Sequence, residues 1–148
     1  MNILRIALAG AIGTTFMTLY SYGVANKKQR QYREPELLNK IIDKAPTGLP
    51  KIMRNNAVGW LIHYTIGFSF SLIYDYIWRK TVVSPNTKNS LIMGALSGVV
   101  GILGWKTFFS VHPNPPKTHY EGFYRQLMVA HIIFGLFAKI GYKLPGRV

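Results

Sequence analysis

Four long apolar runs, separated by short polar segments, dominate the pattern of the chain. They cover roughly residues 3–23, 57–78, 91–111 and 122–142. Each is close to the ~20 residues that an α-helix needs to cross a hydrocarbon core of ~30 Å. The pattern therefore predicts an all-α integral membrane protein, a four-helix bundle that occupies residues 1–148 as a single membrane domain.

The basic loop between the first two runs, residues 24–56, contains a short amphipathic segment at 34–44. Pro35 suits the first turn of a helix, and the acidic residues precede the lysines, as the helix dipole favours. One apolar stripe runs along the segment, formed by Leu37, Leu38, Ile41 and Ile42. We expect a short helix that lies either in the membrane interface or against the end of the bundle.

Charged residues are few and mostly basic. They make up 16% of the 148 residues, against ~25% in an average soluble domain, and 18 Lys and Arg against 5 Asp and Glu give a net charge of +13. Eight of the basic residues lie in the loop 24–56. Because short basic loops stay in the cytoplasm, we expect this loop inside a bacterial cell and both termini on the far side of the inner membrane. The first run is longer than a signal-peptide core and is interpreted as a retained span.

The composition also limits the chemistry. The chain has no Cys, which excludes disulfides and thiolate sites. It contains no Walker loop, no G-x-S-x-G elbow and no H-E-x-x-H helix. No nucleic-acid-reading motif accompanies the positive charge. We therefore expect a protein that is not an enzyme and does not bind nucleic acid.

Small residues recur along the apolar runs, which indicates close helix crossings. In the second run they fall at four-residue spacing together with a histidine: Gly59, His63, Gly67 and Ser71. The third run contains a Gly94-x-x-x-Gly98 pair, and the fourth contains His131, Gly135 and Ala138. Each run is thus predicted to turn a narrow face to its neighbours and a bulky face to lipid.

Ionisable residues inside spans are costly and are candidate functional groups. Asp75 and Lys139 fall at nearly the same level, so they are predicted either to form a salt bridge or to reach the headgroups separately. An ion or proton role for Asp75 is a further alternative.

His63 and His131 lie at levels that differ by only ~4.5 Å at helical rise. Two histidines on facing helices suit a polar site for a small solute or a proton, or the ligation of a haem b between glycine-containing helices. The alternative is that each is a structural group with a hydrogen bond to a hydroxyl of another helix. No other cofactor and no metal is expected.

Basic residues near the cytoplasmic ends of the spans form a second candidate surface, for anionic lipid headgroups or an acidic partner. Its members are Lys27, Lys28, Arg30, Arg33, Lys106 and Arg125, with His112 and His119 in the turn between the last two spans.

Several segments resemble a group of small four-span bacterial inner-membrane proteins without an established activity. They are residues 9–22 (AGAIGTTFMTLYSY), 32–39 (YREPELLN), 60–63 (WLIH) with Gly67, and 131–135 (HIIFG). The resemblance implies a bacterial inner membrane and a four-helix bundle, and it implies no function.

Two functions fit these features. The first is a non-enzymatic accessory or scaffolding subunit of a larger membrane complex, or of a homodimer. The second is a ligand-handling protein that uses a polar site around His63 and His131 for a small solute, a proton or haem.

Overall fold

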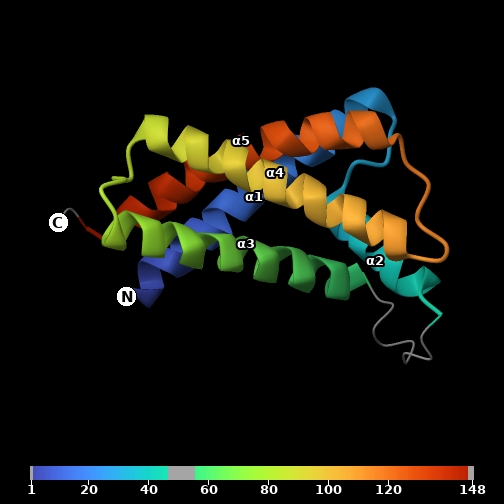
Figure 1. Cartoon of the computed structure of the whole chain (residues 1–148), viewed down its shortest axis with the longest axis horizontal. Helices are drawn as coiled ribbons and strands as arrows, with labels where there is room; N and C mark the ends of the chain where they lie inside the picture. The colour runs from blue at the N-terminus through green and yellow to red at the C-terminus, as the bar shows by residue number, and fades with distance from the viewer. Residues whose placement is uncertain (1, 47–55, 147–148) are drawn as a thin grey trace.

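The structure is a computed structural model, and it describes residues 2–46 and 56–146. Within these ranges the chain forms five helices and no strand. They are α1 (Ile3–Lys28), α2 (Glu34–Lys44), α3 (Asn56–Lys80), α4 (Thr87–Val111) and α5 (Tyr120–Lys143) (Figure 1). Four of them, all except α2, are long and apolar enough to cross a membrane. The all-helical fold with four candidate spans agrees with the sequence prediction.

The helices extend beyond the apolar runs because polar caps set their ends. Asn2 and Asn86 accept hydrogen bonds from the first turns of α1 and α4, and the His119 ring does the same for α5. The α1 helix continues through Lys27 and Lys28 and ends at Gln29, whose φ of 50° is left-handed. The start of the predicted loop 24–56 is therefore helical.

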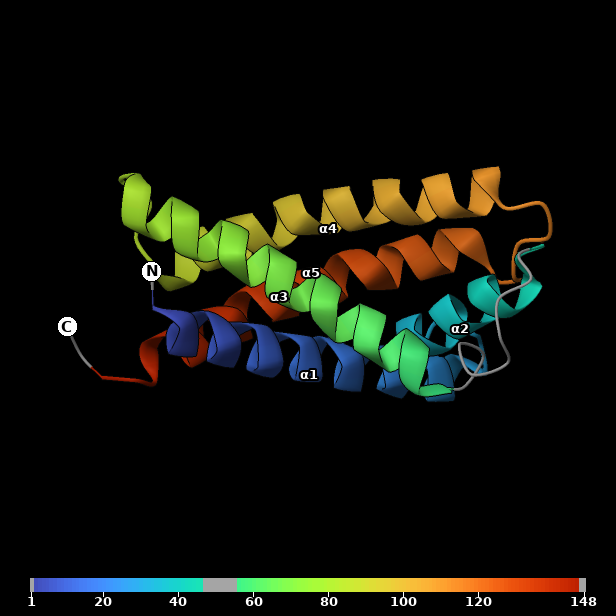
Figure 2. The same cartoon turned by 90° about the horizontal axis from the view of Figure 1, so that it is seen from below.

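The four long helices run lengthwise, with α5 packed between α1 and α4. The α3 helix packs on α1 and, at its beginning, on α2. Both chain ends lie at one end of the bundle, and α2 lies at the other (Figures 1 and 2). We call these the terminal half and the α2 half.

Glycines allow the close crossings that the sequence predicted. A Cβ on Gly135 would lie 2.3 Å from the Ser90 carbonyl oxygen, and one on Gly94 would lie 2.7 Å from that of His131. A Cβ on Gly141 would meet the Leu8 carbonyl oxygen at 2.4 Å. Because these neighbours are backbone atoms, the α4–α5 and α1–α5 contacts require glycine.

The short helix in the first loop lies against the bundle. Leu37 is fully buried, and Leu38 is 6% exposed, in one cluster with aromatic side chains of α4 and α5. The Asn39 side chain accepts a hydrogen bond from the backbone N–H of Gly59 at 2.9 Å. Of the two placements expected for the apolar stripe, the contacts of Leu37 and Leu38 favour packing on the bundle end.

Candidate functional site

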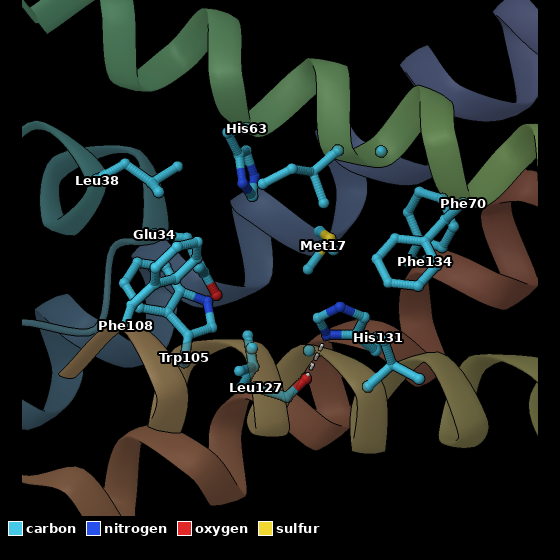
Figure 3. A pocket seen from close by; sticks show the side chains of 15 residues that line it. Met17, Glu34, Leu38, His63, Phe70, Trp105, Phe108, Leu127, His131 and Phe134 are labelled. Carbon is cyan, nitrogen blue, oxygen red and sulfur yellow. Dashed lines mark hydrogen bonds between the residues drawn. The ribbon is translucent and has the colours of Figure 1, made fainter. Parts of the chain in front are cut away.

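The α2 half encloses a cavity of about 210 Å³ to which all five helices contribute (Figure 3). Its lining is mostly apolar and aromatic, with three ionisable side chains among it. These are Glu34 from α2, His63 from α3 and His131 from α5. The structure thus brings the two predicted histidines to one cavity and adds an acid that the sequence analysis did not single out.

The cavity opens sideways between α3 and α4. Both helices pack mainly on other elements rather than on each other (Figure 2). Ile66 of α3 and Val100 and Phe108 of α4 line the cavity and are also exposed on the outside of the bundle, by 39%, 57% and 45%. The mouth is therefore apolar and lies on the lateral surface of two candidate spans.

His63 is buried and is held by Thr18 of α1. Its Nε2 lies 2.8 Å from Thr18 Oγ1, and that hydroxyl donates its own proton to the Thr14 carbonyl oxygen at 2.6 Å. Since the hydroxyl has one proton, we infer that His63 Nε2–H is the donor to Thr18. In a neutral ring the Nδ1 atom is then left with a lone pair.

His131 is fixed in the complementary way. Its Nδ1 lies 2.9 Å from the Leu127 carbonyl oxygen, which can only accept, so Nδ1 carries the proton. The ring packs edge-on against Phe70, with centroids 5.7 Å apart. It also lies against α4, where a Cβ on Gly101 would be 2.8 Å from Nε2. The lone pair of the neutral ring is on Nε2.

Glu34 is the group that sequence reasoning missed. It is 1% exposed, and its Oε1 accepts hydrogen bonds from Ser21 Oγ at 2.7 Å and from Gln126 Nε2 at 3.0 Å. Burial raises the pKa of this carboxyl to about 7, although the two hydrogen bonds oppose that shift. Its place beside Pro35 resembles an ordinary acid in a first helical turn, and only the packing of α2 buries it.

Asp75 and Lys139 do not pair with each other. Asp75 is bound by the Arg79 guanidinium, with Nη2 to Oδ2 at 2.7 Å, and accepts the hydroxyl of Tyr142 at 2.9 Å. Lys139 donates to Thr87 Oγ1 at 3.0 Å. Of the two expected alternatives, the salt bridge between them does not form, because Arg79, one turn after Asp75 on the same helix, provides a nearer cation.

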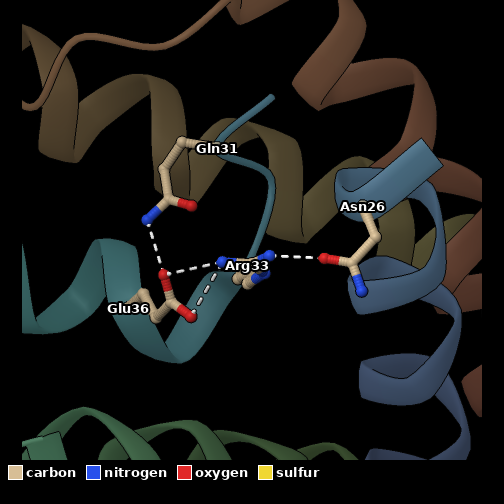
Figure 4. Close-up of polar contacts among 4 residues, drawn as sticks. All are labelled: Asn26, Gln31, Arg33 and Glu36. Carbon is tan, nitrogen blue, oxygen red and sulfur yellow. Dashed lines mark hydrogen bonds and ion pairs between the residues drawn. The ribbon is translucent and has the colours of Figure 1, made fainter. Parts of the chain in front are cut away.

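The candidate basic surface is partly engaged within the protein. Arg33 bonds to Glu36 at 3.3 Å and to the Asn26 side chain, which ties α2 to the end of α1 (Figure 4). Arg125 pairs with Glu121, and Lys106 lies over the ring of Tyr124 at 5.5 Å. The remaining members, Lys27, Lys28 and Arg30, are exposed.

The two histidines do not fit a haem held between them. The Nε2 atom of His63 is already hydrogen-bonded to Thr18, and α4 at Gly101 lies close to the Nε2 atom of His131. The cavity of about 210 Å³ is also smaller than pockets for drug-sized ligands, which begin at roughly 300 Å³. Among the described residues, no group of three or more His, Cys, Asp and Glu is placed to hold a metal ion.

Comparison of the chain with protein families, with curated proteins and with solved structures finds no match. The resemblance to four-span bacterial inner-membrane proteins therefore stays an expectation.

Proposed function

We propose that this is a non-enzymatic integral membrane protein that binds a small lipophilic molecule in the cavity around His63 and His131. The observation that carries the proposal is the combination of a laterally open apolar mouth with polar groups at depth. A molecule dissolved in the hydrocarbon of the bilayer would reach this site without crossing water. Apolar pockets with a few convergent polar groups are the usual form of ligand sites.

The size of the cavity suits a ligand of about one ring. A dry cavity of about 150 Å³ lined by aliphatic and aromatic side chains is large enough to bind benzene. The cavity here is about 210 Å³, so a ring with a short substituent fits. Its fixed histidines would present hydrogen-bond acceptors to such a ligand.

Toluene is a suitable first probe, and Gly104 offers a way to close the site. Gly104 lines the cavity, and a Cβ there meets no atom within 4 Å. Gly23 on α1 has equally open space and lies outside the cavity lining. In detergent, toluene at about ten times its Kd should stabilise the wild type and Gly23→Leu by about 1.4 kcal/mol. Gly104→Leu should show no stabilisation.

Equal stabilisation of all three proteins would contradict the proposal, because toluene would then act outside the cavity. A Soret band in the purified protein, lost in the His63→Ala/His131→Ala double variant, would contradict it in favour of haem. Copurification of one larger membrane complex, without any toluene effect, would favour the accessory-subunit function instead.

We further propose that the α2 end faces the cytoplasm of a bacterial cell and that both termini lie outside the inner membrane. The basic residues of the first loop support this orientation through the positive-inside rule. Because the chain has no Cys, single cysteines introduced at exposed Lys40 and Lys88 can be labelled in intact cells with an impermeant maleimide. Labelling at position 88 and protection at position 40 is the expected result, and the reverse would overturn the orientation.

A further inference from the structure

Glu34 is a buried acid that pairs with no cation among the described residues. Of the ion pairs in the described part of the chain, none includes Glu34. Its Oε1 accepts two hydrogen bonds, whereas Oε2 is buried and has no partner among the described residues. An ionised carboxylate in such a place is strongly destabilising. The group must therefore hold a proton or receive a positive charge from outside the described part of the protein.

The other polar groups of the cavity favour the second possibility. His63 Nδ1 and His131 Nε2 carry lone pairs when the rings are neutral, because their opposite nitrogens donate to Thr18 and Leu127. Trp105 adds an indole N–H, which is a donor only. The acceptors outnumber this donor, so the cavity is complementary to a ligand that donates hydrogen bonds.

Aromatic rings complete the environment that an organic cation requires. Phe70 and Phe134 line the cavity on the side away from Glu34, and Trp105 and Phe108 line it beside α2 (Figure 3). Ring faces attract ammonium groups, and the attraction strengthens where water is excluded. The cavity could thus accommodate both the hydrocarbon part and the charge of a lipophilic cation.

We propose that the cavity binds a small lipophilic ammonium ion, with its nitrogen at Glu34 Oε2 and its hydrocarbon part toward Phe70 and Phe134. This assignment rests on the proposed function and specifies its ligand class. Binding replaces the proton of the Glu34 carboxyl group with the ammonium ion. The protonated acid and the ammonium ion give a carboxylate–ammonium pair, and the displaced proton leaves to water.

The exchange is accessible near neutral pH because burial raises the pKa of Glu34 to about 7. In the part of the chain that the structure describes, few titratable or charged groups surround Glu34. From α3 and α5 they are His63 and His131, and on α1 the phenol of Tyr22 interacts with the Glu34 charge. The residues of α4 that line the cavity include no titratable group. Arg33, the residue before Glu34, is bound to Glu36.

Benzylammonium and its neutral analogue benzyl alcohol test the proposal by calorimetry in a non-ionic detergent. The wild type should bind benzylammonium at least tenfold more tightly than benzyl alcohol at pH 8. Since a proton competes at a site of pKa about 7, benzylammonium should bind about 30-fold more weakly at pH 5.5 than at pH 8. Benzyl alcohol should bind almost equally at the two pH values.

The Glu34→Gln variant keeps an acceptor for Ser21 and Gln126 and removes the charge, so it should fold. It should lose the preference for benzylammonium and the pH dependence while it still binds benzyl alcohol. Glu36→Gln is the matched control, since Glu36 lies on the same helix and is bound to Arg33 and Gln31 outside the cavity. It should bind both probes as the wild type does.

Unchanged benzylammonium affinity in Glu34→Gln would overturn the ammonium assignment. So would benzyl alcohol binding as tightly as benzylammonium in the wild type, and in that case the proposed lipophilic site would stand. If neither probe binds the wild type at any pH, the ammonium assignment fails, and a missing toluene effect shows that the cavity site fails with it.

Discussion

Asp75 in the terminal half and Glu34 in the α2 half are both 1% exposed, yet their surroundings differ completely. Asp75 is held by a guanidinium on its own helix and by the Tyr142 hydroxyl. Glu34 is held by two neutral groups, and one of its oxygens faces no donor among the described residues. Both oxygens of the first acid thus have partners, whereas the described residues leave one oxygen of the second without a partner.

The packing of the two halves differs in the same way. In the terminal half, glycines bring backbone against backbone, as at Gly135 and Ser90, and Trp78 and Tyr142 stack edge-on with centroids 4.7 Å apart. In the α2 half, Gly104 faces open space and a cavity remains. Glycine thus has two roles in one bundle, to close a helix crossing and to leave room. The α2 half also has a close glycine contact, since a Cβ on Gly59 would lie 2.1 Å from the Pro35 carbonyl oxygen, so what distinguishes this half is its cavity.

The largest effect on stability should come from overpacking the tight α4–α5 crossing. Gly135→Leu places a side chain where the Cβ alone would lie 2.3 Å from the Ser90 carbonyl oxygen, so α4 and α5 must separate. We expect a loss of about 3 kcal/mol or more, the upper range for overpacking. Thermal unfolding in detergent measures it, with Gly23→Leu as the control at an open glycine. Equal melting of the two variants would contradict the packing described here.

The next effect concerns the pH dependence of stability. The pKa of Glu34 is raised in the folded state to about 7 from 4.5, so the folded protein holds this proton more tightly than the unfolded chain. The contribution of this proton to the free energy of unfolding is fully present below pH 4.5 and is lost as the pH rises through about 7. From about pH 4 to about pH 8 the loss should reach about 3 kcal/mol.

The difference between wild type and Glu34→Gln in unfolding at several pH values isolates this contribution. The Gln variant should be the more stable protein at pH 8 and should lack this part of the pH dependence. Parallel curves for the two proteins would show that Glu34 does not titrate between the two states.

A smaller effect is expected at the other acid. Asp75→Asn keeps an acceptor for Tyr142 and removes the charge that pairs with Arg79. Because Arg79 is about one-third exposed, the loss should be about 1 kcal/mol, and benzylammonium binding should not change. A lower affinity of Asp75→Asn for benzylammonium would contradict the independence of the terminal half from the cavity in the α2 half.

The smallest effect should be a gain in stability. Gly104→Ala adds a methyl group to open space in a helix, so it should stabilise the protein by about 0.5 kcal/mol, through the reduced freedom of the unfolded chain. The same substitution at Gly135 should destabilise it, and unfolding of the two alanine variants measures the contrast directly. A destabilised Gly104→Ala protein would mean that the mouth of the cavity is closed.

The spans were predictable because their signal is local. A helix in a bilayer must satisfy its own backbone hydrogen bonds over ~20 residues, so length and hydropathy identify it without any knowledge of its neighbours. The shared level of His63 and His131 followed from helical rise in the same way, and both line one cavity. The levels of Asp75 and Lys139 left open whether they pair, because a level along a helix does not determine which cation lies nearest around the helix.

Four apolar helices, a short helix between the first two, and small residues for close crossings could all be predicted from the sequence. The inward packing of α2, the burial of Glu34 with it and the lateral opening between α3 and α4 became visible only in the folded chain. The physical reason is that hydrophobic length and periodicity are properties of consecutive residues. Burial of a single carboxyl group depends instead on which helix faces it, and here Ser21 and Gln126 come from two others.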